Sequence, residues 1–373
     1  MLTPTLKSLV PYSLRRWLRT IKPLPTPDYA RYWPTALKWC LGDARLSADR
    51  LDAHGWLIAT DDLRPHVEFR INGQPVERAD YPLDRRDVEA AFPFAEGSRM
   101  SGFAIRAIRR PGEREWTLTA HNRQTGRWLG PDYAAQSIPD PATVGPLPDA
   151  ARRFRVMAGN EEFLFTHGGL TAFRQLDAAL FQATGKRLRD FPRILDWGCG
   201  SARVARYLLR EPGVTLTGAD VDADNVNWCR ENLPQASWET IPLRPPTTFA
   251  EGSFDAIYGI SVMTHLVEAD QTTWLRELHR LTAPGGFVLL TFHGDSSLAW
   301  SRLSGERYAQ LRRTGFCDLA NVLYDASLDE ADYYRDVYQT IHHVRRVWGE
   351  FFEIVAHAPA TQSHQDLVVL RRR

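Results

Sequence analysis

The fold of this chain is decided by the stretch Ile194-Leu195-Asp196-Trp197-Gly198-Cys199-Gly200-Ser201-Ala202. An apolar run ends in the acid Asp196, two glycines follow at alternate positions, and a helix-forming run begins at Arg203. This order predicts a strand, a tight turn and a helix. Glycines in such a turn allow backbone angles that other residues disfavour and let the backbone approach a ligand closely. Asp196 precedes the first glycine by two residues, which suits a ligand with a cationic amino-acid end.

A second acid follows the next predicted strand. Residues 214–219 alternate β-branched and apolar side chains, and the run ends in Asp220. The interval of 20 residues from Gly200 to Asp220 is typical of a carboxylate that holds ribose hydroxyls across a β-α-β unit. A dinucleotide-binding turn would need a small residue at position 203, where this chain has an arginine. The alternative is a loop that only makes a turn, with Asp196 as a helix cap.

More strands and helices follow along the chain. The apolar spacing of residues 274–281 predicts a helix, and Pro284-Gly285-Gly286 terminates it. Residues 163–183 predict a long helix over the ligand cleft. The further predicted strands are 236–241, 253–260, 287–292, 351–356 and 366–370.

The two acidic motifs together resemble those of class I S-adenosylmethionine-dependent methyltransferases. The segment SVMTHL at residues 261–266 resembles the SVFTHL of a bacterial subgroup of that family. The resemblance covers about residues 150–373. It implies an α/β fold with a doubly wound, Rossmann-like sheet of seven strands, and S-adenosylmethionine as the cofactor.

The resemblance also implies which residues hold this cofactor. Asp196 and the glycine loop would bind the methionine part, Asp220 the ribose, and Val221 would pack on adenine. At Cys199 the backbone, not the sulfur, is the expected contributor. The contact to adenine after the third strand stays open between Ile241 and Glu239. The candidate cofactor residues are Asp196, Gly198, Cys199, Gly200, Ser201, Asp220, Val221, Ile241 and Ser261.

Methyl transfer requires an acceptor in line with the methyl group, and a base where a proton must leave. His265 follows the fourth strand and His293 ends the fifth, so either can be the base near neutral pH. The alternative for His265 is packing of the following helix, and for His293 an orienting hydrogen bond. A contact of substrate with His342, His343 or the tyrosines at 333, 334 and 338 is a further hypothesis, against a solvated helix face.

Composition limits the class of partner. The chain has 373 residues and a net charge of +1, so its electrostatics do not favour nucleic acid. The Asn/Asp-Pro-Pro-Tyr/Phe motif of many base-modifying methyltransferases is missing after the fourth strand. The four cysteines lie far apart, without metal-ligand spacing, which indicates free thiols and no metal. No apolar run approaches the roughly 20 residues that span a bilayer, and no secretion signal is visible. We expect a cytoplasmic protein.

Residues 1–28 form a separate basic tail. Its segment 12–22 places four large apolar side chains on one helical face and its basic residues elsewhere. Such a helix can lie on an anionic membrane surface, which would make the protein membrane-associated. The alternative is packing on its own chain or on a partner subunit.

Residues 40–140 contain short alternating runs and frequent turns, which predict a small β-sandwich. The pair Asn72-Gly73 is a strong hairpin signal. The run beginning VEFRINGQPVERADYP at residue 67 resembles an immunoglobulin-like module found beside bacterial glycosyltransferases and methyltransferases. It carries no catalytic motif, which favours a scaffold or docking role. A Pro-rich linker over 137–148 then leads to the domain of residues 150–373.

Three functions are compatible with these motifs. The leading hypothesis is methylation of a hydroxyl on a glycan or a related small acceptor. The glycan is suggested only by analogy, because similar β modules are associated with polysaccharide-building enzymes. The second is N-methylation of a small metabolite or an amino sugar. The third is a catalytically silent module that binds the cofactor as an assembly partner. The oligomeric state stays open.

Overall fold

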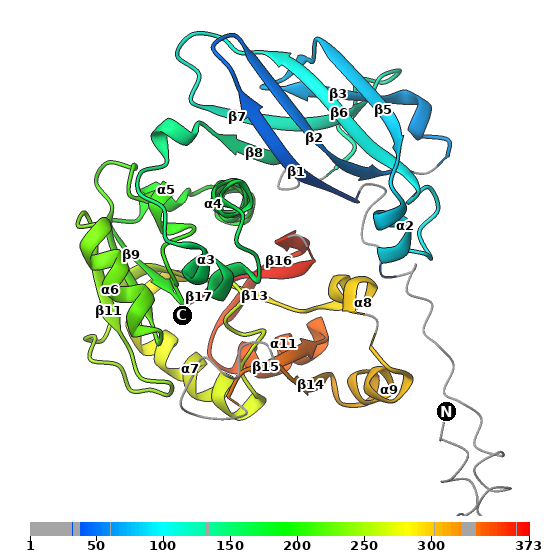
Figure 1. The fold of residues 1–373 in the computed structure, drawn as a ribbon. Helices are drawn as coiled ribbons and strands as arrows, with labels where there is room; N and C mark the ends of the chain where they lie inside the picture. Colours follow the sequence, from blue (N-terminus) through cyan, green and yellow to red (C-terminus); the bar gives the residue numbers. More distant parts are fainter. Residues whose placement is uncertain are drawn as a thin grey trace, which may run out of the picture.

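The computed structural model describes residues 32, 38–59, 61–130, 135–301, 303–321, 333–362 and 364–373. The predicted tail of residues 1–28, with its amphipathic segment, lies outside the described residues. The N-terminal strands form two small sheets at the top of Figure 1, and the α/β part lies below them. Within the described residues, no helix has the length and apolar character that crossing a membrane requires.

The α/β part is built on one seven-stranded sheet, as predicted. Its order is β11-β10-β9-β12-β13-β17-β16, with β9 to β13 parallel and β17 antiparallel to both of its neighbours. From β9 the chain adds β10 and β11 on one side and then β12 and β13 on the other. The direction of strand addition therefore reverses between β9 and β12, where sheets of this kind bind ligands. The bounds are β9 Arg193–Trp197, β10 Thr215–Asp220, β11 Ser237–Thr240, β12 Phe254–Gly259, β13 Thr282–Phe292, β16 Glu353–Gln362 and β17 Gln365–Arg371.

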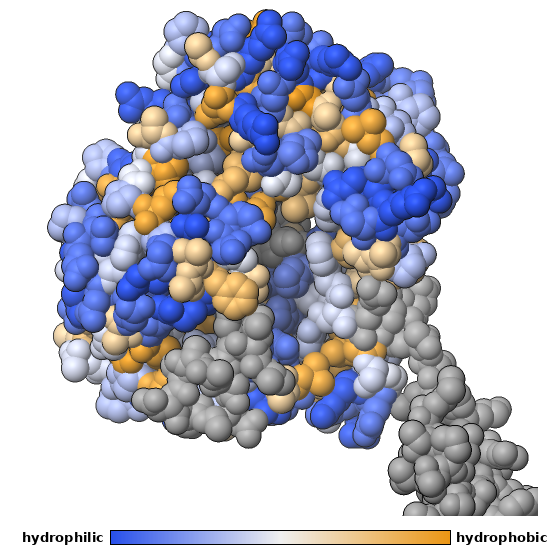
Figure 2. Space-filling view, in the orientation of Figure 1, coloured by the Kyte–Doolittle hydropathy of each residue, from blue (hydrophilic) through white to orange (hydrophobic). Residues whose placement is uncertain are grey.

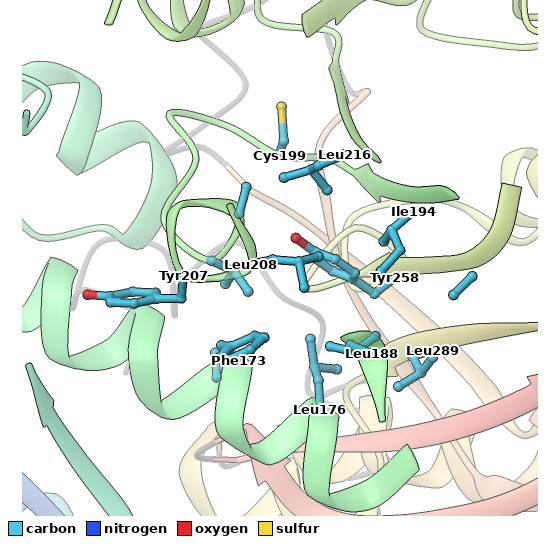
Figure 3. Packing of buried hydrophobic residues seen from close by; sticks show 14 of the residues in the cluster. Phe173, Leu176, Leu188, Ile194, Cys199, Tyr207, Leu208, Leu216, Tyr258 and Leu289 are labelled. Carbon is cyan, nitrogen blue, oxygen red and sulfur yellow. The ribbon is translucent and has the colours of Figure 1, made fainter. Parts of the chain in front are cut away.

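Helices cover both faces of this sheet because neighbouring strand residues point to opposite sides. Ile194 belongs to the core with α4, α5 and α6, whereas Leu195 belongs to the core with α7 and α11. Figure 3 shows Phe173 and Leu176 of α4 on the first of these faces. The bounds are α4 Glu162–Thr184, α5 Ala205–Leu208, α6 Ala223–Asn232, α7 Glu268–Leu281 and α11 Ile341–Val347.

Two predictions for this part need correction. The helix after the glycine loop begins only at Ala205, because Ala202 adopts a left-handed φ of 60° that no helix continues. The long helix α4 does not line the cleft. It packs against the sheet and against β8, while the shorter α3 (Ala150–Met157) reaches the cleft through Arg155 and Val156.

The N-terminal sheets have the orders β1-β2-β6-β5 and β4-β3-β7-β8, and their buried side chains form one common cluster. At the predicted hairpin, Asn72 and Gly73 have φ of 49° and 77°, as a two-residue turn requires. The likeness to immunoglobulin-like modules stays a prediction. The strands are β1 Lys38–Leu46, β2 Arg50–Ile58, β3 Val67–Ile71, β4 Gln74–Pro75, β5 Arg78–Asp84, β6 Met100–Ile108, β7 Glu115–Asn122 and β8 Gln136–Pro139, with helix α2 at Arg86–Ala91.

The predicted linker of residues 137–148 is partly strand, because Ser137–Pro139 complete β8. This strand packs on α4: the Ser137 carbonyl is 2.8 Å from Nδ1 of His167, and its N–H donates to Thr171 (3.0 Å). The N-terminal sheets are thereby anchored on the α/β part.

The remaining elements connect β13 to β16. They are α8 Asp295–Ser301, α9 Gly305–Thr314, β14 Phe316–Ala320 and β15 Arg335–Gln339, with β14 and β15 pairing as a separate ribbon. Short 3-10 helices lie at Arg64–His66, Pro141–Thr143, Leu188–Asp190 and Trp348–Glu350. The face shown in Figure 2 is largely hydrophilic, with apolar residues scattered over it.

Candidate active site

A cleft opens at the carboxyl ends of β9, β10 and β12, where the strand order reverses. Its wall contains Asp196, Gly198, Cys199, Gly200, Asp220, Val221, Ile241 and Ser261 from the predicted set. Ser201 is not part of the wall, because its hydroxyl is buried behind the loop without a hydrogen-bond partner. Ile241 rather than Glu239 faces the cleft, and Glu239 lies 3.7 Å from Arg230 instead. The structure thus gathers nearly all of the predicted cofactor residues at one place.

The glycine loop leaves no space for side chains at its two glycines. Gly198 and Gly200 have φ of 77° and 51°, in the left-handed region that favours glycine. A Cβ atom on Gly198 would lie 2.3 Å from Val262, and one on Gly200 would lie 2.7 Å from Val156. Backbone N–H groups at positions 198 and 199 donate to the Ala219 carbonyl of β10. The loop is therefore held between two strands and covered by α3.

Asp220 organises the loop as well as facing the cleft. Its Oδ2 accepts the N–H of Gly200 at 2.7 Å, and its Oδ1 accepts the N–H of Asp222 at 2.9 Å. Loss of solvation raises the pKa of Asp220, and these backbone hydrogen bonds oppose the shift. Each carboxylate oxygen has a second lone pair. Asp220 can therefore bind ribose hydroxyls while it fixes the loop.

Asp196 is buried at the end of β9, with only 4% of its surface exposed. Burial raises its pKa to about 7, and the charge of Asp220 adds to the shift while Tyr258 and Arg203 oppose it. A cation bound in the cleft would favour the ionised carboxylate. Arg203 also lines the cleft and was missing from the predicted set. Its position directly after the glycine loop was the signal in the sequence that could have identified it. A guanidinium there suits the carboxylate of an amino-acid ligand.

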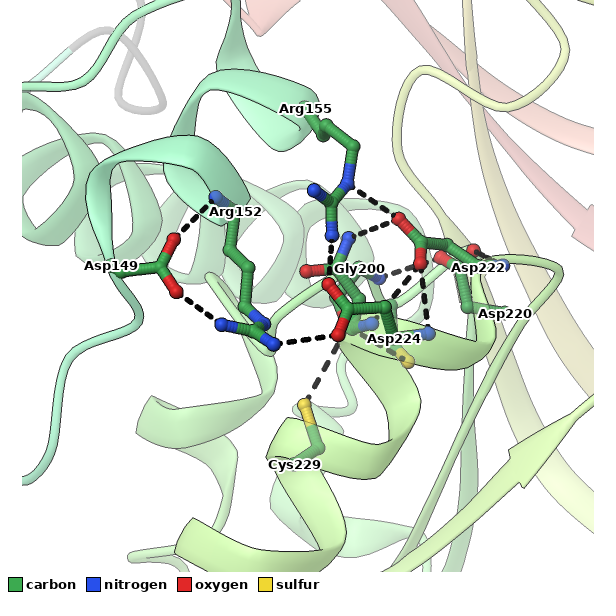
Figure 4. A network of polar contacts seen from close by, with 10 residues as sticks. Asp149, Arg152, Arg155, Gly200, Asp220, Asp222, Asp224 and Cys229 are labelled. Carbon is green, nitrogen blue, oxygen red and sulfur yellow. Dashed lines mark hydrogen bonds and ion pairs between the residues drawn. The ribbon is translucent and has the colours of Figure 1, made fainter. Parts of the chain in front are cut away.

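Ion pairs hold α3 against the start of α6 at the cleft edge (Figure 4). Arg155 binds Asp222 at 2.8 Å and Asp224 at 2.6 Å, and Arg152 binds Asp224 at 2.6 Å. These pairs place Arg155 and Val156 in the cleft wall, which no motif predicted. Only the packing of α3 on α6 brings these basic and acidic residues together.

His265 lines the cleft, as expected for a candidate base. Its Nδ1 lies 2.9 Å from the Arg335 carbonyl, so Nδ1 must carry the proton and the lone pair is assigned to Nε2. Burial lowers the pKa of His265, so the ring is neutral at pH 7. Strand β15 fixes the segment, with N–H groups of Arg335 and Val337 donating to the carbonyls of His265 and Thr264. Tyr333 and Tyr334 complete this wall.

His293 is not among the residues that line the cleft, which argues against its predicted role as the base. Strand β15 covers it: its Nδ1 lies 3.1 Å from the Val337 carbonyl, and its ring stacks between Tyr338 and His364. Burial lowers its pKa well below the usual range. His342 and His343 lie in α11, also away from the cleft wall. Of the tyrosines in this segment, Tyr333 and Tyr334 reach the cleft.

Residues 194–286 match the family model described as a methyltransferase domain. Among curated proteins, methyltransferase GfsG of Streptomyces halstedii is 28% identical over 153 residues, which cover 40% of this chain and 46% of that protein. The fatty-acid O-methyltransferase of Mycolicibacterium smegmatis is 33% identical over 101 residues, or 26% of this chain and 36% of that protein. The chain spans about half the length of GfsG and less of the second relative.

Two solved structures also match part of this chain. The 1,6-didemethyltoxoflavin-N1-methyltransferase of Burkholderia thailandensis, crystallised with 1,6-didemethyltoxoflavin and S-adenosylhomocysteine, is 17% identical. The match covers 64% of this chain and 95% of that chain, with a TM-score of 0.39. The PH0226 protein of Pyrococcus horikoshii is 15% identical, over 56% of this chain and 95% of that chain, with a TM-score of 0.40.

Proposed function

We propose that this chain is an S-adenosylmethionine-dependent methyltransferase that methylates a hydroxyl oxygen. The observation that carries the proposal is the cleft itself, in which a close-packed glycine loop lies between the acids that end β9 and β10. The methyltransferase domain matched by residues 194–286 supports it, because this segment contains both acids, the loop and His265.

The chemistry of the wall fits the proposed cofactor. Asp196 offers a carboxylate to the ammonium group and Arg203 a guanidinium to the carboxylate of the methionine part. Asp220 suits the ribose diol, and the apolar side chains of Val221 and Ile241 suit the faces of adenine. The Oδ1 atom of Asn225, also in the wall, is buried without a hydrogen-bond partner and would accept a ligand donor. S-adenosylmethionine supplies an electrophilic methyl group when bound.

The residues of the chain would position the acceptor and take up its proton. His265 lines the cleft, and with its proton on Nδ1 it would take up the proton of the acceptor at Nε2. His265 would accept the proton of the acceptor hydroxyl, whose oxygen would receive the methyl group that the bound cofactor supplies. General-base assistance of this kind contributes roughly 10²–10⁴-fold. Tyr334 lies edge-on to the His265 ring, with ring centroids 5.4 Å apart, and bounds the acceptor side.

For the acceptor we propose a glycan or a related small polyol. Support comes from the N-terminal sheets and their resemblance to modules found beside polysaccharide-building enzymes, which is an argument by analogy. The chain's net charge of +1 also gives no electrostatic preference for nucleic acid.

Calorimetry with S-adenosylmethionine and S-adenosylhomocysteine tests the cofactor. Transfer of a labelled methyl group to a panel of mono- and oligosaccharides, with amino sugars as the N-acceptor comparison, tests the reaction. We expect cofactor binding and labelled O-methyl product. Failure to bind either cofactor form at millimolar concentration would refute the proposal, and label found only on amino nitrogen would replace the hydroxyl acceptor with an amine.

A further inference from the structure

Arg206 is a buried arginine on the side of the glycine loop away from the cleft. Only 3% of its surface is exposed, and it does not line the cleft. Its guanidinium donates to three backbone carbonyls: Nε to Ala202 at 3.0 Å, Nη2 to Ser201 at 3.2 Å and Nη1 to Pro146 at 2.9 Å. The ring of Phe165 in α4 lies 5.0 Å from its guanidinium carbon. Three segments far apart in the sequence therefore meet at one side chain.

The environment of Arg206 is unfavourable for a cation. Among the described residues, no carboxylate forms an ion pair with it, and burial lowers its pKa to about 10. Burying a charge without a counter-charge costs free energy, and an apolar side chain of similar volume is often more stable in such a place. The free energy of folding alone therefore does not explain an arginine at this position.

What Arg206 does hold is the backbone on both sides of Ala202. Ala202 has a φ of 60°, a left-handed conformation that residues other than glycine seldom adopt. Arg206 binds the carbonyls of Ser201 and Ala202, which belong to the two peptide groups that flank the Ala202 Cα. Fixing both peptide planes stabilises this conformation. The preceding Gly200 and the following Arg203 both line the cleft, so the loop geometry there depends on the same turn.

The third carbonyl connects this turn to the N-terminal part of the chain. Pro146 lies in the linker after β8. One turn beyond Arg206, Arg210 binds the Thr143 carbonyl at 2.6 Å and Glu115 of β7 at 3.0 Å. Arg210 lies two residues beyond the end of α5. This short segment thus contacts the linker and the N-terminal sheets through Arg206 and Arg210, and it directly follows the glycine loop.

We propose that Arg206 is a positioning residue that couples the cofactor-binding loop to the linker and the N-terminal sheets. Cofactor binding then stabilises the docking of those sheets, and the docked sheets strengthen cofactor binding, because such coupling is reciprocal. The inference rests on the proposed function for its choice of ligand.

The test uses the full chain, S-adenosylhomocysteine and three variants. Arg206→Met fills the space without hydrogen bonds, and Arg206→Lys keeps the charge but cannot reach three carbonyls. Arg210→Met is the matched comparison, since it removes contacts with the linker and with β7 without touching the loop. We expect at least tenfold weaker binding by both Arg206 variants and an unchanged or higher melting temperature for Arg206→Met. Arg210→Met should weaken binding by a smaller factor, because it removes docking contacts and leaves the loop carbonyls bound to Arg206.

Hydrogen exchange provides a second measurement that a purely structural role would not move. In the wild-type chain, S-adenosylhomocysteine should slow exchange in residues 141–148 as well as in 198–203, and this distant protection should vanish in Arg206→Met. The inference would be overturned if Arg206→Met bound S-adenosylhomocysteine within threefold of wild type and retained the ligand-induced protection of residues 141–148. If wild type binds no cofactor, the proposed function fails. In that case, hydrogen exchange of the ligand-free proteins still tests the coupling. We expect residues 141–148 and 198–203 to exchange faster in Arg206→Met than in wild type, and unchanged exchange would overturn the inference.

Discussion

Replacement of Asp196 by asparagine should remove most of the pH dependence of cofactor binding. The wild-type carboxyl has a pKa of about 7 because it is buried, so near pH 6 the empty cleft holds mainly the neutral acid. A ligand ammonium group requires the carboxylate. The ligand amine stays protonated up to the usual α-amino range of about 7.7–8.0. Binding must therefore be accompanied by release of the Asp196 proton, and it weakens as the pH falls.

The size of the effect follows from this pKa. With half-ionisation at about 7, the ionised fraction falls about 25-fold between pH 7.5 and 5.5, and Kd should rise by about the same factor. At pH 7.5 Asp196→Asn should lose about 1.5–3 kcal/mol of binding free energy, the scale of hydrogen bonds to a charged group. At pH 5.5 the two proteins should bind nearly alike, since wild type then also carries a neutral group.

The stability of the empty protein should change in the opposite direction. The folded pKa of Asp196 lies above its ordinary value of 3.8, so its stabilising contribution is complete below pH 4 and is lost as the pH rises through 7. The shift corresponds to roughly 4 kcal/mol at pH 8. Asp196→Asn, which cannot ionise, should therefore unfold at a higher temperature than wild type at pH 8, and this advantage should shrink to about 1 kcal/mol near pH 4.5.

Calorimetric titration with S-adenosylmethionine at half-unit steps from pH 5.5 to 7.5 checks the binding, and scanning calorimetry checks the stability. Any pH dependence that comes from other groups, such as Asp220, remains in the variant. The difference between wild type and variant therefore isolates the contribution of Asp196. A wild-type Kd that stays constant over this range, or a variant with the same slope as wild type, would refute the assignment of Asp196 to a ligand cation.

Three further predictions concern other parts of the chain. Gly198→Ala should weaken cofactor binding at least tenfold by calorimetry, since its Cβ would lie 2.3 Å from Val262; Gly213→Ala, with a φ of 81° and open space around it, is the control that should bind normally. His265→Ala should lower turnover roughly 10²–10⁴-fold with unchanged cofactor Kd, and near-normal turnover would exclude His265 as the base. The activity of wild type should persist below pH 6.5, because burial lowers the pKa of His265. His167 has a pKa of about 4, so it stays neutral in the fold and stability falls as the pH drops from 6.5 toward 4. Urea unfolding at pH 7.5 and 5.5 measures this effect. Between these two pH values, the free energy of unfolding should fall by about 1 kcal/mol less for His167→Gln than for wild type, and an equal fall would contradict the lowered pKa of His167.

The sequence by itself determined the seven-stranded sheet and the position of the cleft. Apolar runs that end in Asp196 and Asp220 carry enough local information, because strand propensity, glycine turns and the ends of parallel strands coincide there. Eight of the nine predicted cofactor residues lie in the cleft wall for the same reason. Ser201 is the one that does not line the cleft, and its side chain is buried, because neighbouring residues in a turn can face either side of the backbone.

Tertiary structure alone decided which side chains from distant segments complete the site. Residues 265 and 293 both follow strands of the same sheet, yet β15 covers His293 and leaves His265 facing the cleft. Arg155 reaches the wall through ion pairs with α6. Arg206 binds carbonyls 5 residues and 60 residues away. Contacts between distant segments depend on how whole elements pack, and local propensity and spacing contain no information about that packing.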